Sequence, residues 1–546
     1  TTLVHLHHHH IAPIFRRSWH SLLIQSSPQS IWSTTSARFK TTSSHHVFDS
    51  SLHHIIPCKS FFSSFGESKL RTQSSMINRE YSTNERQAST ENQIPPQRSE
   101  SLDDYEPIAQ QLDPIENLPL KNSNTMREQV VLLGTGWGGF SFIKNFDLTN
   151  CDLHIVTPRN HFLFTPLLAS ACVGTLEFRS IVEPVRRARK EENYFYNAAK
   201  CVQIDTDQKL LRCRPVYDRE KGDYAIRYDR LIVSVGMDVN TMGVRGAEMH
   251  GYFLKELDHA RKIRYKIIEC FEKATNPRLS IQERQELLHF VAIGGSFTGI
   301  ELMSEIHDFI KEDLSNLFPE LMLECKLSII EAGPQILSTF DKSLQVYAKK
   351  HFRNEHINIY TGRKVVEVRE NGVQLDDGSN ITAGLVIWTA GIQSRKLFHH
   401  GRSGGLPLDR AQRVVVDEHL RVKGYEGSIY AMGDCASIDT APLAATAQVA
   451  SQQGKYLASF VAQQLEGKEP NETNSFTYSH RGTMAYIGNY KSITETKEFK
   501  LRGRASWVLW RSSYLTMLLS IRNKILVPLD WAKAWFFGRD VMNFKS

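Results

Sequence analysis

The sequence has few cysteines and no long hydrophobic run, and both shortages narrow what the protein can be. Eight cysteines are spread over 546 residues, and no two stand at CxxC spacing. This pattern argues against a disulfide scaffold, a zinc site and an iron–sulfur site, so we expect no metal, and it is typical of a reducing compartment. No apolar stretch reaches the roughly 18–20 residues that a membrane-spanning helix needs. The net charge is only +7, and we expect no nucleic-acid partner.

The beginning of the chain differs in composition from the rest. Residues 1–80 contain eight Lys and Arg but only three acidic residues, in a background rich in Ser, Thr and His. Such an Arg-bearing, acid-poor segment is typical of an organelle transit peptide. Residues 81–127 are polar and acidic without periodicity, and we interpret them as a linker. The remaining length allows two or three domains with their own cores.

A glycine-rich motif opens the next part of the chain. The stretch VVLLGTGWGGFSFIKNF, residues 130–146, places Gly134, Gly136 and Gly139 at GxGxxG spacing between an apolar run and a helix-like segment. In a dinucleotide site these glycines make the tight turn, let a pyrophosphate approach the backbone and let the helix pack closely on the sheet. The N–H groups that open the helix then face the phosphates. The following strand, DLHIVTPRN, lacks the acid that usually binds the ribose.

A second motif of the same kind follows 160 residues later. LLHFVAIGGSFTGIELMSEI has Gly294 and Gly299 at the first and last motif positions, with Ser296 in the middle. The Ser296 side chain would either crowd the pyrophosphate or donate a hydrogen bond to it. The next strand, KLSIIEA, ends in Glu331, whose carboxylate can accept hydrogen bonds from a ribose diol and repel a 2′-phosphate. The alternative for Glu331 is a solvated strand end.

A third segment completes the pattern of an α/β protein. GSIYAMGDCAS runs into Gly433 and Asp434, and an Asp in this position suits a hydrogen bond to a polyol such as a ribityl chain. Strands alternate with helical stretches, as in parallel sheets with crossover helices. Two strands, LIVSVG and LVIWTAG, stop on a glycine where the chain would cross between domains. The order predicts two Rossmann-like domains, for FAD and NAD(P), with the second inserted in the first.

The motifs resemble one flavoprotein family in particular. The matching segments are PRNHFLFTPLLASACVGTLEFRSIVEP, FLKELDHARKIR, GGSFTGIE, VIWTAGI, YAMGDCAS, AQVASQQGKYLA, AYIGNYKSI and LWRSSYLTMLLSIRNKILVPLDWAKAWFFGRDV. Together they resemble the type II (alternative, rotenone-insensitive) NADH:quinone oxidoreductases, from about residue 128 to 544. Ser296 and Ala169 depart from the family pattern.

The resemblance implies two cofactor sites. FAD would be bound by Gly134, Thr135, Gly136, Trp137, Gly138, Gly139, Thr157, Pro158, Arg159, Thr165, Pro166, Gly236, Asp434, Ala447 and Gln448. NADH, the co-substrate, would be bound by Gly294, Gly295, Ser296, Phe297, Thr298, Gly299, Glu301, Glu331, Ala390 and Gly391.

The resemblance also implies a reaction and three catalytic residues. NADH would deliver a hydride to the flavin, which would pass two electrons to ubiquinone. Glu256 stands at the family position for a carboxylate close to nicotinamide and quinone, and the alternative is a helix-start acid. Gln448 and Gln452 lie four residues apart on one helix face, where such pairs are usually solvated, and would face the flavin or a quinone carbonyl.

Two alternatives remain open at this point. The first is another quinone-reducing or disulfide-reducing flavoprotein of the same two-dinucleotide architecture. Sulfide-oxidising and disulfide-reducing relatives need two cysteines at the flavin, but Cys172, Cys201 and Cys435 are scattered along the chain. A scaffold that kept the fold and lost turnover is suggested only by Ser296. Bleaching of the flavin on addition of NADH separates an active enzyme from such a scaffold.

The C-terminal part of the chain predicts attachment to a membrane. Residues 501–546 contain eight Lys and Arg against two Asp. An apolar stripe at helical spacing is formed by Trp507, Trp510, Tyr514, Leu518, Ile521 and Ile525. Pro528 suits the first turn of a second, Trp-rich helix. Amphipathic helices with basic flanks lie in the interface of an anionic membrane, although a core-packing helix or a homodimer face could show the same stripe.

These observations predict five segments and a location. The segments are a transit peptide (1–80), a linker (81–127), an FAD-binding domain (128–250 and 384–478), an NADH-binding domain (251–383) and a C-terminal anchoring or dimerisation region (479–546). We expect a peripheral protein of the mitochondrial inner membrane that pumps no protons. The lack of a second hydrophobic segment after the leader favours the matrix face.

Overall fold

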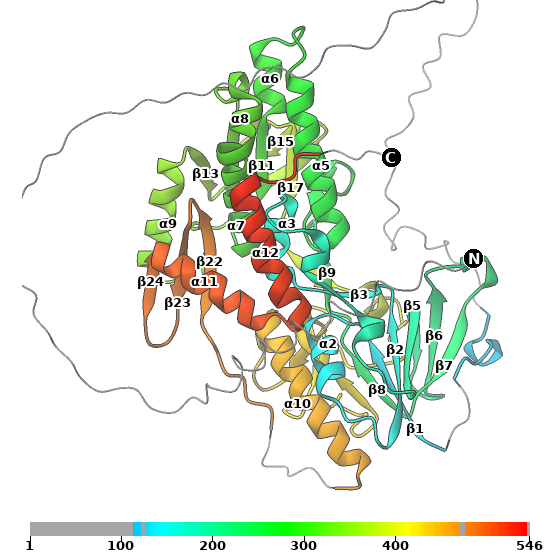
Figure 1. The fold of residues 1–546 in the computed structure, drawn as a ribbon. Coiled ribbons are helices and arrows are strands. Elements are labelled where there is room, and N and C mark those ends of the chain that lie inside the picture. Colours follow the sequence, from blue (N-terminus) through cyan, green and yellow to red (C-terminus); the bar gives the residue numbers. More distant parts are fainter. Residues whose placement is uncertain (1–112, 123–125, 469–474, 543–546) are drawn as a thin grey trace, which may run out of the picture. The chain divides into compact units, whose positions relative to one another are not determined.

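Two sheets, each with a strand that runs into a glycine turn, organise this computed structural model, which describes residues 113–122, 126–468 and 475–542 (Figure 1). The predicted transit peptide and most of the predicted linker lie outside the described residues. The α/β fold class predicted from the sequence is confirmed.

The first sheet has seven strands and begins with the strand before Gly134. The order is β20 (Ile429–Ala431), β8 (Arg230–Val233), β1 (Glu128–Leu133), β2 (Cys151–Thr157), β5 (Tyr194–Asp205), β6 (Leu210–Pro215) and β7 (Tyr224–Arg227). The first five are parallel, and β6 and β7 join as antiparallel strands. β1 and β2 are almost wholly buried, as expected of strands in a parallel sheet that is covered on both faces.

The second sheet has five parallel strands. The order is β10 (Tyr252–Phe253), β17 (Leu385–Trp388), β11 (His289–Ile293), β12 (Lys326–Glu331) and β13 (Ile357–Thr361). The predicted boundary after residue 383 is therefore wrong, because it assigns β17 to the FAD domain. The segments that form β8 and β17 are both short apolar runs ending near glycine, and such a pattern does not say which sheet a strand joins.

Helices cover the two sheets. Those along residues 137–354 are α2 (Trp137–Asn145), α3 (Leu168–Cys172), α4 (Ala247–His250), α5 (Leu257–Ala274), α6 (Ile281–Leu287), α7 (Phe297–Phe309), α8 (Ser315–Leu317) and α9 (Lys342–Asn354). A π-helical turn, η6 (Ile310–Leu314), continues α7. α10 (Ala447–Leu465) packs along α2, and α7 contacts both β11 and β12. The helices that open at the two glycine motifs therefore each lie on their own sheet.

Smaller ribbons connect these parts. β9 (Met237–Val239) pairs with β18 (Ile392–Ser394) where the chain passes from one sheet to the other and back. The others are β3 (His161–Leu163) with β4 (Val182–Pro184), β14 (Val365–Arg369) with β15 (Gly372–Leu375) and β16 (Asn380–Thr382), and β19 (Val414–Val416) with β21 (Ala436–Ile438).

The end of the predicted linker belongs to the fold, which corrects the boundary at residue 127. Residues 113–122 lie along β7, where Lys121 N–H donates to the carbonyl of Ala225 and Ala225 N–H donates to the carbonyl of Pro119. Ile115, in the helical turn η1 (Ile115–Asn117), is buried. Asn122 is also buried, and its side chain donates to the carbonyl of Arg227 at 2.7 Å. Two buried side chains and an edge pairing therefore hold a segment that is polar overall and has no visible sequence period.

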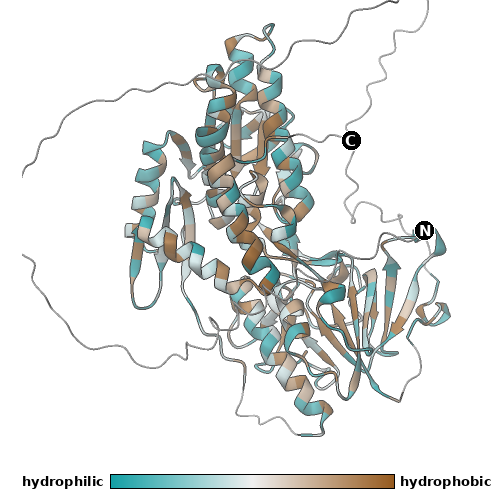
Figure 2. Cartoon of the chain, in the orientation of Figure 1, coloured by the Kyte–Doolittle hydropathy of each residue, from teal (hydrophilic) through white to brown (hydrophobic). Residues whose placement is uncertain are grey.

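The C-terminal region contains a sheet that the sequence did not reveal. β22 (Thr483–Gly488), β23 (Lys491–Glu495) and β24 (Lys500–Gly503) form an antiparallel sheet, followed by α11 (Arg504–Met517) and α12 (Ile521–Phe537). Figure 2 shows many hydrophobic residues along α12. Among the described residues, no helix combines the length and apolarity needed to cross a bilayer.

Two expectations about these helices are wrong. α12 begins at Ile521, where the Ser520 side chain accepts a hydrogen bond from the N–H of Asn523, so Pro528 lies inside the helix and not in its first turn. The predicted stripe is also divided between two helices, because α11 ends at Met517. Trp510 and Tyr514 pack into the core, whereas Ile521 and Ile525 are exposed on α12. For α11, the alternative of a core-packing helix is therefore the correct one.

Candidate active site

The first glycine cradle, residues 134–139, has the backbone geometry of a dinucleotide turn. Gly134 adopts φ +90°, a region that side chains rarely enter, and a Cβ on Gly139 would lie 2.1 Å from the carbonyl oxygen of Gly134. Both positions therefore exclude any other residue. A Cβ on Gly136, by contrast, would meet only the Arg159 guanidinium at 4.0 Å. The cradle is thus closed toward the sheet and open at Gly136, beside a cation and the N-terminus of α2.

The structure brings further predicted FAD residues to this cradle. The hydroxyls of Thr135 and Thr157 are 3.2 Å apart, and the indole N–H of Trp137 donates to the hydroxyl of Thr165 at 3.0 Å. Pro158 precedes Arg159 directly, and Pro166 follows Thr165. The loop after β2 and the segment that opens η2 (Thr165–Leu167) therefore both reach the open side of the first cradle.

Asp434 lines a second part of the same site. It stands in the helical turn η9 (Gly433–Cys435), beside a small cavity that Gly433 and Gln453 also line. No hydrogen-bond partner for its carboxylate occurs among the described residues, and burial raises its pKa while Lys255 opposes the shift. A carboxylate in a cavity without a partner suits the hydroxyl groups of a ribityl chain. The residues present therefore fit FAD: a cradle for the pyrophosphate and an acceptor for the polyol.

The sequence did not single out Gln453, although it follows Gln452 directly. Its amide oxygen accepts a hydrogen bond from the N–H of Gly433 at 2.7 Å, and its side chain is buried. It joins α10, which begins at Ala447, to the turn that carries Asp434. Gly236 lies after β8 at φ +66° with open space around it. The pair Gln452–Gln453 was the sequence feature that could have pointed to it. Of two adjacent glutamines on a helix, one can turn toward the protein interior and fix a neighbouring loop.

Glu256 forms an ion pair with Arg159. The two side chains are 2.8 Å apart, and both are only partly exposed. Burial raises the pKa of Glu256, but Arg159 outweighs it, so the net pKa is lowered and the group is ionised at neutral pH. Glu256 is also the N-cap residue of α5, in a capping box with His259. The helix-start role and the position beside the first cradle therefore coexist.

The second glycine cradle, residues 294–299, repeats the geometry of the first. Gly294 adopts φ +112°, and a Cβ on Gly299 would lie 2.0 Å from the carbonyl oxygen of Gly294. The loop after β17 closes against it, because a Cβ on Gly294 would come within 3.1 Å of the backbone nitrogen of Ala390. Gly391 follows at φ +74°.

Ser296 occupies the open middle position of the second cradle. It is the N-cap residue of α7, has an extended backbone that any residue can adopt, and makes no side-chain cap bond. Its side chain is exposed. Phe297 and Thr298 follow it in the first turn of the helix. Serine therefore costs no backbone strain where the first cradle has Gly136, and its hydroxyl faces open space.

Glu331 ends β12 against the second cradle. One carboxylate oxygen accepts a hydrogen bond from the N–H of Gly295 and the other from the N–H of Gly333, both at 2.6 Å. The structure therefore brings Glu331 to the turn that would hold the NADH pyrophosphate.

Gln448 and Gln452 both bind the segment that leads to β22. The Gln448 amide donates to the carbonyl of Gly482 at 2.9 Å, and the Gln452 amide donates to the carbonyl of Ser479 at 2.9 Å. The Gln452 carbonyl accepts the N–H of Ser479 in return. The two side chains are therefore engaged with the protein and are not simply solvated.

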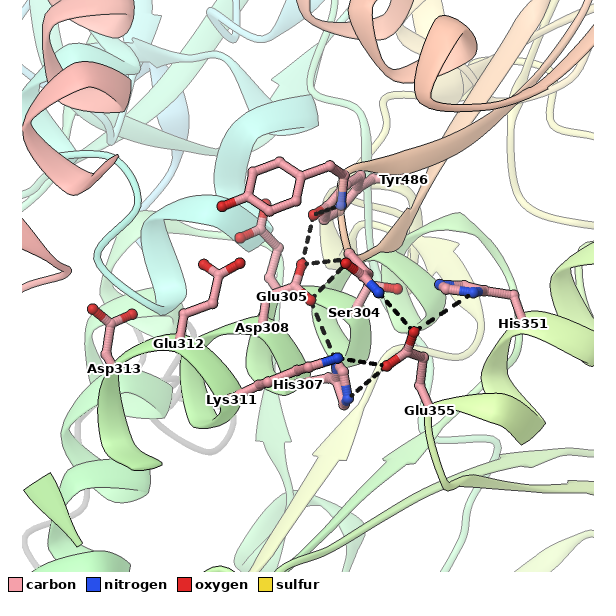
Figure 3. Close-up of polar contacts among 12 residues, drawn as sticks. Ser304, Glu305, His307, Asp308, Lys311, Glu312, Asp313, His351, Glu355 and Tyr486 are labelled. Carbon is pink, nitrogen blue, oxygen red and sulfur yellow. Dashed lines mark hydrogen bonds and ion pairs between the residues drawn. The ribbon is translucent and has the colours of Figure 1, made fainter. Parts of the chain in front are cut away.

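A row of buried acids on α7 was not predicted as a unit. Glu301 accepts hydrogen bonds from the N–H of Tyr486 at 3.0 Å and from the indole of Trp510 at 3.3 Å, and burial raises its pKa to about 8. Figure 3 shows Glu305 and Asp308 farther along the same helix. Asp308 accepts from the hydroxyl of Tyr486 at 2.5 Å. Glu301, expected to bind NADH, is thus in contact with the C-terminal region.

The cysteines do not form a redox pair at the flavin site. All seven cysteines within the described residues are free thiols. Burial raises the pKa of Cys172, Cys201 and Cys435. A cysteine that reduces disulfides needs a lowered pKa and a partner cysteine. The disulfide-reducing alternative therefore has no support in this part of the chain.

Comparisons with known proteins agree with this geometry. The family described as "Pyridine nucleotide-disulphide oxidoreductase" matches residues 128–454, and the family described as "NDH2 C-terminal domain" matches residues 480–540. "Probable NADH dehydrogenase" of Dictyostelium discoideum is 44% identical over 418 residues, which cover 76% of this chain and 91% of that protein. "Internal alternative NAD(P)H-ubiquinone oxidoreductase A1, mitochondrial" of Solanum tuberosum is 36% identical over 445 residues, covering 76% and 88%.

A solved structure is similar over the same part of the chain. The structure of NDH2 from Plasmodium falciparum in complex with NADH superposes with a TM-score of 0.71 at 26% sequence identity. It covers 76% of this chain and 100% of that one.

Proposed function

Because the chain belongs to the type II NADH dehydrogenase family, we propose that it is an FAD-dependent NADH:ubiquinone oxidoreductase that pumps no protons. The observation that carries the proposal is the pair of glycine cradles of equal geometry, of which only the second is followed by an acid, Glu331. One cradle suits FAD and the other NADH. When bound, FAD accepts a hydride from NADH and passes the electrons on to a quinone.

The residues of the first cradle bind and orient the flavin nucleotide. The N–H groups at the start of α2 and the Arg159 guanidinium face the position of the pyrophosphate, where the open space at Gly136 lets it approach. Asp434 accepts hydrogen bonds from the ribityl hydroxyls. Glu256, held ionised by Arg159, keeps that guanidinium in place and presents a carboxylate at the start of α5.

The residues of the second cradle select NADH. The Glu331 carboxylate accepts hydrogen bonds from the adenosine ribose hydroxyls, and its charge repels a 2′-phosphate. Its two backbone contacts hold it in the required position before the nucleotide arrives.

The quinone end of the site is formed by α10 and the segment before β22. Gln448 and Gln452 fix residues 479–482 against the N-terminal half of α10, which also carries Gln453 on the turn of Asp434. We propose that this fixed segment forms one wall of the quinone path and that the Gln448 amide lies next to the flavin ring. The support for this proposal is that α10 carries all three contacts: Gln453 binds the turn of Asp434, and Gln448 and Gln452 bind residues 479–482.

Attachment to the membrane surface is the role we propose for α12. Its exposed side chains at spacings of mostly four residues are Ile521, Ile525, Leu529 and Phe536, with Trp535 and Phe537 beside them. Arg522 and Lys524 are exposed on the same helix. Such a helix suits the interface of an anionic bilayer, from which a quinone would be drawn.

We also propose a homodimer and a location. Val508 on α11 and Phe499 near β24 leave apolar surface exposed in the C-terminal region, which supports association of two copies there. The Solanum tuberosum relative is mitochondrial by name. We place this protein on the mitochondrial inner membrane, at the matrix face.

The function is tested by one pair of additions to the purified FAD protein without oxygen. NADH should bleach the flavin absorption, and a short-tailed ubiquinone should restore it. A degraded scaffold would show no bleaching. A disulfide reductase would be bleached but reoxidised by a disulfide and not by the quinone, and this result would contradict the proposal.

A further inference from the structure

A cavity of about 190 Å³ lies between α7, the C-terminal sheet and the two C-terminal helices. Its wall includes Glu305 of α7, Tyr490 after β22, Trp507 and Arg511 of α11, and Trp531 of α12. None of the residues assigned above to FAD or NADH lines it, and neither Gln448 nor Gln452 does. The cavity is therefore separate from the cofactor sites.

Arg511 is held in this wall in an unusual way. Its guanidinium carbon lies over two indole rings, 4.3 Å from the centre of Trp507 and 4.4 Å from the centre of Trp531. Cation–π contacts of this kind use the face of the planar group and leave its N–H edge. No carboxylate or carbonyl oxygen among the described residues accepts from that edge, and the buried Nε–H has no partner. The edge therefore lacks an acceptor.

The other charged groups of the cavity have partners. Arg539 donates to Glu312 at 2.8 Å and forms an ion pair with Asp313 at 2.6 Å. Glu305 accepts from the hydroxyls of Ser170 at 2.6 Å and Thr175 at 3.1 Å. Burial raises the pKa of Glu305, which favours its neutral form. Arg511 differs from them, because within the described residues it has no ion pair and no hydrogen bond to a carboxylate, and Glu305 acts on it only through space.

The cavity adjoins the surface proposed to meet the membrane. Trp535 lines it and is itself 72% exposed, next to the exposed Phe536 and Phe537. Tryptophan side chains of membrane proteins gather at the level of the lipid headgroups. With α12 attached to the membrane as proposed above, the Arg511 guanidinium over two indoles would lie at the depth of the lipid phosphates.

We propose that this cavity binds the phosphate of a membrane phospholipid, with the in-plane N–H groups of Arg511 as its ligands. A planar guanidinium matches phosphate oxygens in a paired, charge-assisted geometry, and the indoles offer apolar surface to the glycerol and upper acyl carbons. A neutral quinone would leave the positive charge without a counter-ion. The inference rests on the membrane attachment proposed above for its source of lipid, but the binding itself can be measured without a membrane.

The test measures binding by titration calorimetry. A short-chain phosphatidylglycerol, kept below its critical micelle concentration, is titrated into the full-length FAD protein. Arg511→Gln should weaken binding at least tenfold. Arg511→Lys keeps the charge but loses the paired N–H groups of the guanidinium, so its affinity should lie between those of the parent and of Arg511→Gln. Arg522→Gln is the matched control, because it removes an exposed cation from α12 outside the cavity and should bind like the parent. Flavin content and reduction by NADH should stay unchanged in all three variants.

Further arms identify the source of the phosphate. The same titration is run with inorganic phosphate, with a short-chain diacylglycerol and with a tail-free ubiquinone. Binding of phosphatidylglycerol without binding of diacylglycerol supports the proposal, whereas tight binding of inorganic phosphate would make a free anion the occupant. Equal affinity of Arg511→Gln and the parent, or displacement of the lipid by the quinone, would overturn it. If the parent protein bound the short-chain lipid but did not bind vesicles, the result would count against membrane attachment by α12 and not against this lipid site.

Discussion

Glu331 is the residue on which cofactor choice depends in this account. Its two carboxylate oxygens accept backbone N–H groups of Gly295 and Gly333, so the side chain already has a fixed direction. Glu331→Gln keeps a similar shape and removes the charge that repels a 2′-phosphate, and its amide NH2 group loses one of the two backbone hydrogen bonds. We expect the ratio of kcat/KM for NADH to that for NADPH to fall by about tenfold, the effect of roughly 1.4 kcal/mol.

The measurement is the steady-state rate with each nucleotide under equal conditions. Glu286→Gln, an equivalent change on the surface of α6, serves as the control and should leave the ratio as it is. An unchanged ratio in Glu331→Gln would mean that Glu331 does not bind the ribose.

The raised pKa of Glu301 should make the stability of the protein depend on pH. Burial raises its pKa to about 8, whereas a Glu in an unfolded chain titrates near 4.3. The native state therefore holds a proton that the unfolded state has released. This contribution to stability is fully present below the unfolded pKa and is lost as the pH rises through the native one. Glu301→Gln keeps an acceptor oxygen for Tyr486 and Trp510 but cannot ionise.

We therefore expect the melting temperature of the parent protein to fall, relative to Glu301→Gln, as the pH rises from about 5 to about 8. The difference should reach at least about 3 °C, since one kcal/mol moves the melting temperature of a large domain by a few degrees. Thermal unfolding followed by circular dichroism measures it. Parallel curves for the two proteins would show that Glu301 is ionised in the native state.

Some site residues could be predicted from the sequence and others could not. Gly134 and Gly294 are recognisable because a positive φ and a close approach leave glycine as the one possible residue. The buried acids Glu305 and Asp308 could not be recognised, because acids three or four residues apart on a helix usually mark a solvated face. Only the packing of the C-terminal sheet against α7 shows that they are buried.

At the scale of elements, the two glycine cradles permit a matched comparison. In the first, a Cβ on Gly139 would collide with the carbonyl of Gly134 at 2.1 Å, whereas one on Gly136 meets nothing closer than 4.0 Å. Gly139→Ala should lower the stability of the flavin-free protein as well as its flavin content. Gly136→Ala should leave the flavin-free protein as stable as the parent and weaken FAD binding alone. Thermal unfolding and an FAD titration of the apoprotein check this pair.

If Gly136→Ala bound FAD as tightly as the parent, the open face at Gly136 would not be the pyrophosphate site. If both variants lost stability equally, the cradle would be a structural turn only.

The C-terminal helices show where a sequence period misleads. Trp510, Tyr514 and Ile521 continue one helical spacing across the break after Met517, although the first two are buried and the third is exposed. Spacing cannot reveal a break that is made by the backbone of three residues, 518–520. A truncation before Trp507 would therefore remove core side chains, and we expect it to destabilise the fold.

Membrane attachment is better tested on the exposed face of α12. Ile525 and Leu529 are more than half exposed, and replacing both by Glu adds two negative charges to the stripe. We expect co-sedimentation with anionic liposomes to fall at least tenfold, since each interfacial charge is worth about 1 kcal/mol. Flavin content should not change. Leu323→Glu, an exposed leucine outside α12, is the control, and equal pelleting of both proteins would contradict the role of α12.

At the scale of the whole molecule, the sequence predicted an α/β architecture with one nucleotide domain inserted in another. This prediction was possible because each glycine cradle is the turn of a strand–turn–helix unit, and each unit can be recognised in the sequence without the other. The boundary between the two domains could not be predicted to the residue, since β17 resembles the strands of the first sheet in composition. The C-terminal sheet was missed because its strands are short and polar on one face.

In the proposed reaction, electrons pass from NADH to ubiquinone through one bound flavin without proton transport. The most direct measurement places the FAD protein on sealed vesicles that contain ubiquinone and a pH-sensitive dye, and records NADH consumed, ubiquinol formed and internal pH together. We expect one ubiquinol for each NADH, dependence on the flavin, uptake of one proton per turnover from the external medium and a constant internal pH. NADH consumption without ubiquinol, or an internal pH that changes in step with turnover, would contradict this mechanism.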